Sequence, residues 1–417
     1  MTHKTSIIIL THNQLPITQM CLSSIRCYTD EPYELIVVDN GSTDATVSYL
    51  KSQADVKSIF NNINLGFAKG CNQGIEVATG DTILFLNNDT IVTPNWLTAM
   101  LRVLYGDDDI GAVGPVTNYA SGQQKIAVGY DDLTGLNAFA HEHGTRHAGY
   151  SFDVRRIIGF CMLFKRKIIE EVGGFDERYG LGNYEDDDMC LRVLNRGYRL
   201  RVVYDSYIHH FGHMTTKILQ NANLGGLLVI NREKAREKWG QDIHSLIYKD
   251  PVAITLVLPI DEHTVDHVKV ILPQIQQMAE EIIVLDRGAD ASVLAKVLEL
   301  TSKVVKSGTD TPEVWWSRIV TESTKKFLFW MNPAEHMSAD ERRKLSGIKL
   351  SLHDQVDAVS IQLQLEGGEP TTGGESSIVR RNRIVRRDAA FQWDDLNDEF
   401  LLESEGHVES SDILITY

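Results

Sequence analysis

An apolar run that ends abruptly in two amides and a carboxylate is the first segment of the chain that could do chemistry. The run Ile83-Leu84-Phe85-Leu86 is typical of a strand buried on both faces of a parallel sheet. Asn87, Asn88 and Asp89 follow at its carboxyl end, where open α/β sheets bind ligands. Their oxygens suit a hard divalent cation that holds a phosphate. Taken alone, the segment also fits a plain polar turn, since turns favour Asn and Asp.

Two earlier strand-like runs also end in polar residues. Ser6–Leu10 is followed by Thr11, His12 and Asn13, and Glu34–Val38 is followed by Asp39. Carboxyl ends of parallel strands meet at one sheet edge, so we expect these residues near Asp89. Asp39 can accept hydrogen bonds from a base or a ribose, whereas Asp44 reads as a helix cap.

A glycine-rich stretch from Asn64 to Gly74 enters a predicted helix. Glycines let the backbone approach a ligand, and a helix N-terminus favours phosphate. The spacing matches neither the Walker P-loop nor the dinucleotide fingerprint, so as a generic loop it is weak evidence.

Four acids, Glu185 to Asp188, stand at another predicted helix start. Carboxylates there oppose the macrodipole, and Asp188 with Arg192 makes a favourable i,i+4 pair. Neither effect needs four acids in a row, so one of them could be a general base. His209, His210 and His213 follow a later strand-like run, and near Asp89 one of them could bind a metal.

The elements that must position these residues alternate between strand-like and helix-like runs from residue 6 to residue 104. This rhythm predicts a mainly parallel sheet with helices on both faces. Residues 117–155 read as an irregular loop over the site. The pattern restarts near residue 250, where Ala253–Leu258, Glu281–Gly288 and Lys326–Asn332 repeat three earlier segments in order. An internal duplication is the favoured interpretation, and two unrelated α/β domains are the alternative.

Composition narrows the functional classes. The 417 residues carry a formal net charge of −16, which argues against a nucleic-acid partner or an anionic membrane surface. No apolar run is long enough to span a bilayer, and no signal peptide opens the chain. The five cysteines are scattered without a CxxC pair, so we expect no disulfide framework and no zinc site. The predicted location is cytoplasmic, or peripheral at the inner membrane face.

Six motifs together resemble family-2 glycosyltransferases of the GT-A fold, in the family order and over residues 5–215. They are Thr11-His12-Asn13, the run from Val37 to Asp44, Asn64–Gly74, Leu86–Asp89, Gly173-Gly174-Phe175-Asp176 and the stretch from Glu185 to Arg192. The resemblance implies inverting transfer of a hexosyl, N-acetylhexosaminyl or rhamnosyl group from a UDP- or dTDP-sugar, usually with Mg²⁺ or Mn²⁺. The acceptor would be a glycan, a lipid-linked glycan or a protein, and the enzyme could form a homo-oligomer.

The resemblance also assigns roles by position. It implies nucleoside contacts for Thr11, Asn13 and Asp39, and donor-site contacts for Asn64, Gly66, Asn72 and Asn88. Asp89 would be the metal ligand, completed by His210 or its rival His213. Asp186 would be the catalytic base, with Glu185 or Asp188 orienting the acceptor.

The sequence departs from the family pattern in two places, and both bear on these assignments. Asn87 stands where a carboxylate is usual, which puts strict metal dependence in doubt. The second half has Asn332-Pro333-Ala334-Glu335 at the acidic-loop position, and Asp398 where some relatives carry a histidine. We therefore predict a catalytic domain over residues 1–245 and a smaller, degenerate and catalytically silent GT-A-like domain over residues 252–417.

The competing hypothesis is a scaffold that holds a sugar nucleotide or glycan without turnover. The intact Glu185-Asp186 pair argues against it. A nucleotidyltransferase is a poor third choice, because its glycine-rich and basic phosphate motif near the N-terminus is absent.

Overall fold

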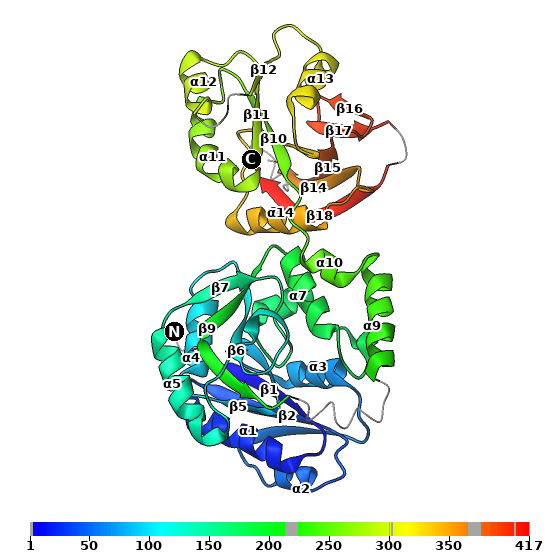
Figure 1. The fold of residues 1–417 in the computed structure, drawn as a ribbon. Helices are drawn as coiled ribbons and strands as arrows, with labels where there is room; N and C mark the ends of the chain where they lie inside the picture. The colour runs from blue at the N-terminus through cyan, green and yellow to red at the C-terminus, as the bar shows by residue number, and fades with distance from the viewer. Residues whose placement is uncertain are drawn as a thin grey trace, which may run out of the picture. The chain divides into compact units, whose positions relative to one another are not determined.

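The computed structural model describes residues 3–212, 224–299, 301, 303–365, 377–403 and 406–416. The chain divides into an N-terminal unit, Met1–Leu194 with Tyr198–Lys249, and a C-terminal unit, Asn195–Gly197 with Asp250–Tyr417 (Figure 1). Each unit is built around its own sheet. The expected α/β class is confirmed.

The N-terminal unit alternates strands and helices, as its apolar runs predicted. Its elements are β1 (Thr5–Thr11), α1 (Leu15–Tyr28), β2 (Tyr33–Asn40), α2 (Thr46–Lys51), β3 (Val56–Asn61), α3 (Phe67–Val77), β4 (Thr82–Asn87), β5 (Thr90–Val92), α4 (Trp96–Leu104), β6 (Ile110–Thr117), α5 (Leu136–Arg146), β7 (Ser151–Val154), β8 (Cys161–Lys165), α6 (Arg166–Val172), α7 (Glu185–Asn195), β9 (Arg199–His210), α9 (Leu224–Trp239) and α10 (Ile243–Ile247). Short 3-10 turns lie at Gly122–Gln124, Leu133–Gly135 and Glu177–Tyr179.

The strand order of this sheet is β3-β2-β1-β4-β8-β6-β9-β5, with β7 paired to β9. Strands β3, β2, β1 and β4 are parallel to one another, and β8 joins antiparallel between β4 and β6. The chain leaves β1 toward β2 and β3 and returns to β4 on the other side. The strand order therefore reverses between β1 and β4, which is where open α/β sheets bind their ligands.

Helices cover both faces of this sheet. On one face, α1 and α4 bury Leu22, Trp96 and Met100 against Ile9 and Leu84. On the other face, α3 lies so close to β1 that a Cβ at Gly70 would come within 2.2 Å of the Leu10 side chain. The glycines of the Asn64–Gly74 stretch thus permit close packing of a helix on a strand as well as a turn.

Residues 117–155 are not the irregular loop that we expected. They contain the 11-residue helix α5 and strand β7. The buried positions of α5 are Leu136, Ala140 and His143, which follow helical spacing but include a histidine and a small residue. A window with so few large apolar residues reads as a loop.

The C-terminal unit repeats the strand plan. Its elements are β10 (Ile254–Ile260), α11 (Val265–Met278), β11 (Glu281–Asp286), α12 (Ala291–Val297), β12 (Val304–Lys306), α13 (Pro312–Glu322), β13 (Phe327–Trp330), α14 (Ala339–Ser351), β14 (Ala358–Leu365), β15 (Ser377–Arg386), β16 (Phe391–Asp394), β17 (Glu399–Leu402) and β18 (Val408–Thr416). Its main sheet has the order β12-β11-β10-β13-β15-β14-β18.

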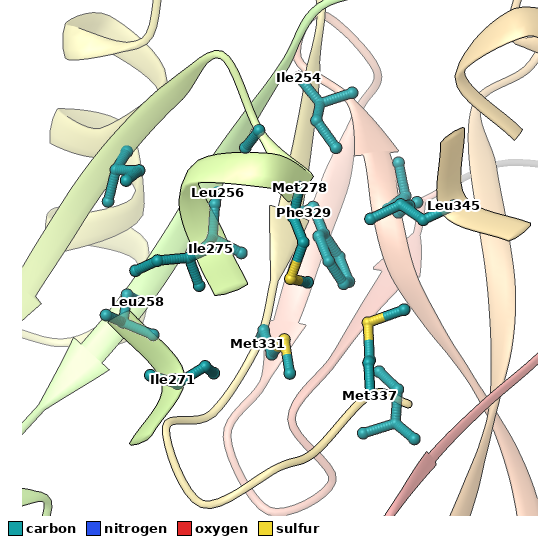
Figure 2. Packing of buried hydrophobic residues seen from close by; sticks show 14 of the residues in the cluster. Ile254, Leu256, Leu258, Ile271, Ile275, Met278, Phe329, Met331, Met337 and Leu345 are labelled. Atoms are coloured by element: carbon teal, nitrogen blue, oxygen red, sulfur yellow. The ribbon is translucent and has the colours of Figure 1, made fainter. Parts of the chain in front are cut away.

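This order matches β3-β2-β1-β4-β8-β6-β9 position by position, and every neighbouring pair has the same parallel or antiparallel sense. The match supports the predicted duplication of the fold. Helix α11 covers one face of the second sheet, where Ile271 and Ile275 pack with Leu256, Leu258 and Phe329 (Figure 2).

Candidate active site

A cleft of about 410 Å³ opens in the N-terminal unit at the carboxyl ends of β1, β2 and β4. Thr11, Asn40 and Asn87–Asp89 line it from these strand ends. The other walls include His210 at the end of β9, the turn at Gly66, and the residues numbered 158–160, 181–183, 185 and 186. The cavity thus lies at the reversal of strand order.

Pairing between β5 and β9 sets Asp89 beside His210. Thr90 is the register partner of His210, and the Phe211 amide donates to the Asp89 carbonyl oxygen at 3.0 Å. His210 Nδ1 lies 2.8 Å from the Tyr119 carbonyl oxygen, which can only accept, so Nδ1 carries a proton. Nε2 faces Asp89 Oδ1 at 3.1 Å. When the imidazole is neutral, its Nε2 is an acceptor, and so is Asp89 Oδ1. A second proton on the ring or a shared cation is therefore needed between these two atoms.

Within the described ranges, no group of three or more His, Cys, Asp and Glu side chains could hold a metal ion by itself. Asp89 and His210 therefore offer two ligands, and water or substrate oxygens would have to supply the others. His213, the rival ligand, lies outside the described residues.

Asn88 and Thr11 are joined in one hydrogen-bonded group beside the cleft. The Asn88 amide donates to Thr11 Oγ1 at 3.3 Å and to Thr18 Oγ1 at 3.1 Å. Asn13 turns away from this group, because its Oδ1 accepts from the Thr43 amide at 2.7 Å. Asn13 therefore braces the loop after β2, and it is not among the described residues that line the cleft.

Asp39 is 1% exposed, and Thr11 is its register partner across β1 and β2. Its Oδ2 accepts from the Ser42 amide at 3.0 Å. Its Oδ1 is buried and has no hydrogen-bond partner among the residues that the structure describes. Asp39 is not among the described residues that line the cleft, although its neighbours Thr11 and Asn40 are. A buried carboxylate oxygen without a partner is costly, so this atom is suited to receive a hydrogen bond from a ligand that reaches it.

The turn at Asn64–Gly66 is held by Asn40, whose Nδ2 donates to Asn64 Oδ1 at 3.2 Å and to the Gly66 carbonyl oxygen at 3.0 Å. Gly66 has φ 89°, and a Cβ there would lie 2.0 Å from the Gly180 carbonyl oxygen. Only glycine fits this position. Asn72 lies outside the described cleft lining. Its side-chain amide binds the backbone of Phe175: Oδ1 accepts from the Phe175 N–H and Nδ2 donates to the Phe175 carbonyl oxygen, both at 2.8 Å.

Glu185 and Asp186 face the cleft from the first turn of α7. Asp186 Oδ2 accepts from the Gly159 amide at 3.0 Å and Oδ1 from the Asp187 amide at 2.9 Å. Glu185 Oε2 is buried without a partner among the described residues. Burial raises the pKa of both carboxyls, and their mutual repulsion raises the Glu185 pKa further. The N–H groups stabilise the Asp186 anion, so we assign the charge to Asp186 and the proton to Glu185.

The next two acids are held in ion pairs, outside the described cleft lining. Asp187 pairs with Arg156 and lies 2.9 Å from His244 Nε2. Asp188 is fully buried and pairs with Arg192 at 2.8 Å and Lys238 at 2.6 Å. Four consecutive acids are tolerated at this helix start because Asp187 and Asp188 are each neutralised by cationic side chains.

Several residues of the site had no assigned role in the sequence analysis. His12 lines the cleft, and Asn118 holds the His210 backbone through hydrogen bonds of 2.8 and 3.0 Å. The position of His12 after a strand was a usable signal. Asn118, Arg156 and His244 gave none, because their partners lie 31 to 92 residues away in the chain.

None of the helices in the described part of the chain is both long enough and apolar enough to cross a membrane.

Comparison with known proteins shows which families the sequence of the N-terminal unit resembles. Residues 6–173 match the family described as Glycosyl transferase family 2, and residues 140–217 match the N-terminal domain of galactosyltransferase. An uncharacterized glycosyltransferase of Bacillus subtilis, YwdF, is 26% identical over 239 residues, 57% of this chain and 84% of that protein. The N-acetylglucosaminyl-diphospho-decaprenol L-rhamnosyltransferase of Mycobacterium tuberculosis is 26% identical over 248 residues, 52% of this chain and 78% of that protein.

Among solved structures, a mannosyltransferase of Pyrobaculum calidifontis in complex with GDP-Man and Mn²⁺ is 20% identical, with a TM-score of 0.40, covering 53% of this chain and 61% of that one. The matched part spans 23% to 84% of the relatives' own length. Residues 6–173, which lie in the N-terminal unit, thus match glycosyltransferase family 2, and the two relatives compared over most of their own length are glycosyltransferases.

Proposed function

We propose that the N-terminal unit transfers a sugar from a nucleotide-diphosphate sugar to an acceptor hydroxyl, with inversion at the anomeric carbon. One observation carries the proposal: the Asp89–His210 pair and the Glu185–Asp186 pair face one cleft. A base on one side of a sugar and a diphosphate site on the other suit a single direct displacement, which inverts the configuration.

The donor end fits a divalent cation, Mg²⁺ or Mn²⁺, held by Asp89 and His210. Carboxylate and imidazole are suitable ligands, and adjacent ligands of an octahedral ion with 2.1 Å bonds lie about 3 Å apart. The observed separation of Nε2 and Oδ1 is 3.1 Å. Such a cation, when bound, would neutralise negative charge on the leaving diphosphate.

Charge balance favours the same interpretation. The lining includes three carboxyls, Asp89, Glu185 and Asp186, and no Lys or Arg among the residues that the structure describes. A diphosphate would meet repulsion there without a counter-charge. Asn87 in place of a carboxylate removes one anionic ligand, so we expect weak rather than tight cation binding.

The nucleoside would lie toward β1 and β2. Asp39 Oδ1 and the turn Asn64–Gly66 offer an acceptor and a close backbone approach for a uridine or thymidine nucleotide. We propose contacts from Thr11, Asp39, Asn64, Gly66 and Asn88, while Asn13 and Asn72 would act by bracing the loops around them.

At the acceptor end, Asp186 would remove the hydroxyl proton. Its two N–H partners orient it, and its raised pKa makes the ionised form a stronger base than an exposed aspartate. Glu185 in its protonated form would donate a hydrogen bond to a sugar or acceptor oxygen. Asp188 would support this helix turn without contacting substrate.

Three classes of acceptor fit the proposal: a glycan, a lipid-linked glycan and a protein. The name of the M. tuberculosis relative specifies a lipid-linked diphosphate acceptor, which makes such molecules the first to try.

A thermal-shift screen of UDP- and dTDP-sugars with and without Mn²⁺ would select the donor, because a ligand that binds only the native state raises Tm. Release of nucleoside diphosphate would then be measured with each acceptor class. Acceptor-dependent release with inverted product supports the proposal. Binding without release, with every acceptor, would favour the scaffold hypothesis instead.

A further inference from the structure

The acidic turn of the cleft is approached through an unusual loop, residues 180–184, which we call the glycine loop. Leu181, Gly182 and Asn183 line the cleft, and Glu185 and Asp186 follow directly. Positive φ angles occur at Gly180 (62°), Gly182 (136°), Asn183 (75°) and Tyr184 (79°). Asn adopts this region more readily than most residues, but Tyr rarely does so unless its surroundings impose it. Something outside the loop must therefore hold it.

Asn231 on α9 makes the contacts that can do so. Its side chain is fully buried. Its Nδ2 lies 2.8 Å from the Tyr179 carbonyl oxygen, 2.9 Å from that of Gly182 and 3.2 Å from that of Asn183. One amide group thus joins the residue before the glycine loop to its last turn.

The chemistry of the amide fixes its orientation. Three carbonyl oxygens can only accept, so the NH₂ group must face them. The Asn231 Oδ1 on the other side is buried without a partner among the described residues. An aspartate has the same shape but would place an acceptor against three acceptors. The position therefore requires a donor, and not merely a side chain of this size.

The glycine loop also contacts the donor side of the cleft. The Gly180 carbonyl oxygen occupies the place where a Cβ on Gly66 would be, 2.0 Å away. Gly182 lies on the other side, near Glu185, since a Cβ there would be 3.9 Å from Glu185 Oε1. A shift of the loop would thus move the turn that carries Glu185 and Asp186.

We infer that Asn231 is a positioning residue, which clamps the glycine loop and so fixes the acidic turn against the acceptor. This inference rests on the proposed function. It assigns no contact between Asn231 and substrate. It predicts that loss of the amide donor impairs turnover more than donor binding, because Glu185 and Asp186 directly follow the glycine loop. Thr11 and Asp39 lie on β1 and β2, and Asp89 lies between β4 and β5.

The test compares Asn231→Asp and Asn231→Ala with Arg236→Ala in the full chain. Arg236 lies on the same helix and pairs on the surface with Glu233, which makes it a matched control. Misplacing a catalytic group by about 1 Å can lower turnover roughly 100-fold. We expect kcat to fall roughly 10- to 100-fold in both Asn231 variants, with little change in the KM for the donor. The control should keep the wild-type kcat.

Amide hydrogen exchange gives a readout that does not depend on turnover. We expect faster exchange of residues 180–188 in both Asn231 variants, but not in Arg236→Ala. In the wild type, the Gly180 and Gly182 amides, which donate to Glu177 and Tyr179, should exchange slowly. Asn231→Asp keeps the side-chain volume, so it tests the donor even if Asn231→Ala does not fold.

The two proposals fail separately. If the wild type transfers no sugar, the proposed function is wrong, and the exchange data still decide whether Asn231 clamps the loop. Rapid exchange of the loop in the wild type, or unchanged loop exchange and kcat in a folded Asn231→Asp, would overturn the clamp.

Discussion

The two units share one strand order, but the same edge of each sheet carries different chemistry. In the N-terminal unit, β4 is followed by Asp89, which faces His210 at 3.1 Å in an open cleft. In the C-terminal unit, β13 is followed by Glu335, which pairs with Arg383 at 2.6 Å. Both of these side chains are fully buried. The guanidinium is itself a cation, so the carboxylate at this edge is already neutralised.

Aromatic side chains fill the rest of the second edge. Trp330 ends β13, where Asn87 ends β4, and its ring lies 4.4 Å from that of Trp393. Trp315 and Trp316 pack beside it, and the Arg287 guanidinium lies 5.4 Å above the rings of Trp315 and Trp330. The two units thus share a scaffold, while the residues after each strand decide whether that edge of the sheet is an open site or a packed core. We propose on this ground that the C-terminal unit does not transfer sugar.

The largest effect should come from removing the base of the first unit. Asp186→Asn should lower transfer roughly 100- to 10,000-fold, the usual contribution of a general base, because the amide cannot accept the hydroxyl proton. Initial rates of nucleoside diphosphate release would measure it. Asp398→Asn, the same type of change in the C-terminal unit, should leave the rate unchanged. An equal loss in Asp398→Asn would assign chemistry to the second unit.

Breaking the buried pair of the second unit should destabilise that unit. Arg383→Met leaves Glu335 buried without its counter-charge, which costs about 3–5 kcal/mol of unfolding free energy. The double variant Arg383→Met/Glu335→Leu should recover most of this loss. Urea denaturation followed by tryptophan fluorescence suits the test, since four of the six tryptophans lie in this unit. If Arg383→Met alone were as stable as the wild type, the Arg383 guanidinium would not be the counter-charge that Glu335 requires.

Replacing Asp89 should weaken the cation site of the first unit. Asp89→Asn removes a direct ligand of the proposed cation. We expect the binding of nucleoside diphosphate with Mn²⁺ to weaken by at least the roughly 10- to 100-fold that changes of outer-shell partners cause. Calorimetry with and without Mn²⁺ would measure this. Glu335→Gln should not change the affinity, and a similar loss in that variant would argue that the two edges act alike.

The smallest effect is a shift in pH dependence. Burial and the charge of Asp187 raise the Asp186 pKa, and Arg156 opposes them. The base must be ionised, so kcat/KM should fall as pH drops through this raised pKa, above the usual value of about 3.9 for aspartate. Arg156→Gln removes the opposing charge and should move the acid limb to still higher pH. A limb that stays in place or moves down would contradict the assignment of the base.

Much of the fold follows from local patterns. Strands such as Ile83–Leu86 and Leu256–Leu258 are buried on both faces and read as continuous apolar runs, and the repetition of such runs led to the prediction of a duplication. Helix α5 was missed because its packing face uses Ala140 and His143, so its apolar periodicity is weak.

The sequence predicted only part of the candidate site. Asp89, His210, Glu185 and Asp186 stand at the end of a strand or the start of a helix, the family resemblance singled them out there, and all four line the cleft. The sequence could not show that Asn72 is bound to Phe175, 103 residues away, or that Asp188 is enclosed by Arg192 and Lys238. Polar residues in a motif look alike whether their partners are substrate or distant backbone.

The central claim is that the sheet edge of the N-terminal unit is an open ligand site and the matching edge of the C-terminal unit is a packed core. Its most direct test is the stoichiometry of nucleoside diphosphate binding to the full chain in the presence of Mn²⁺. Isothermal titration should give one site per chain, weakened by Asp89→Asn and unaffected by Glu335→Gln. Two sites per chain, or one site that is lost in Glu335→Gln and kept in Asp89→Asn, would contradict it.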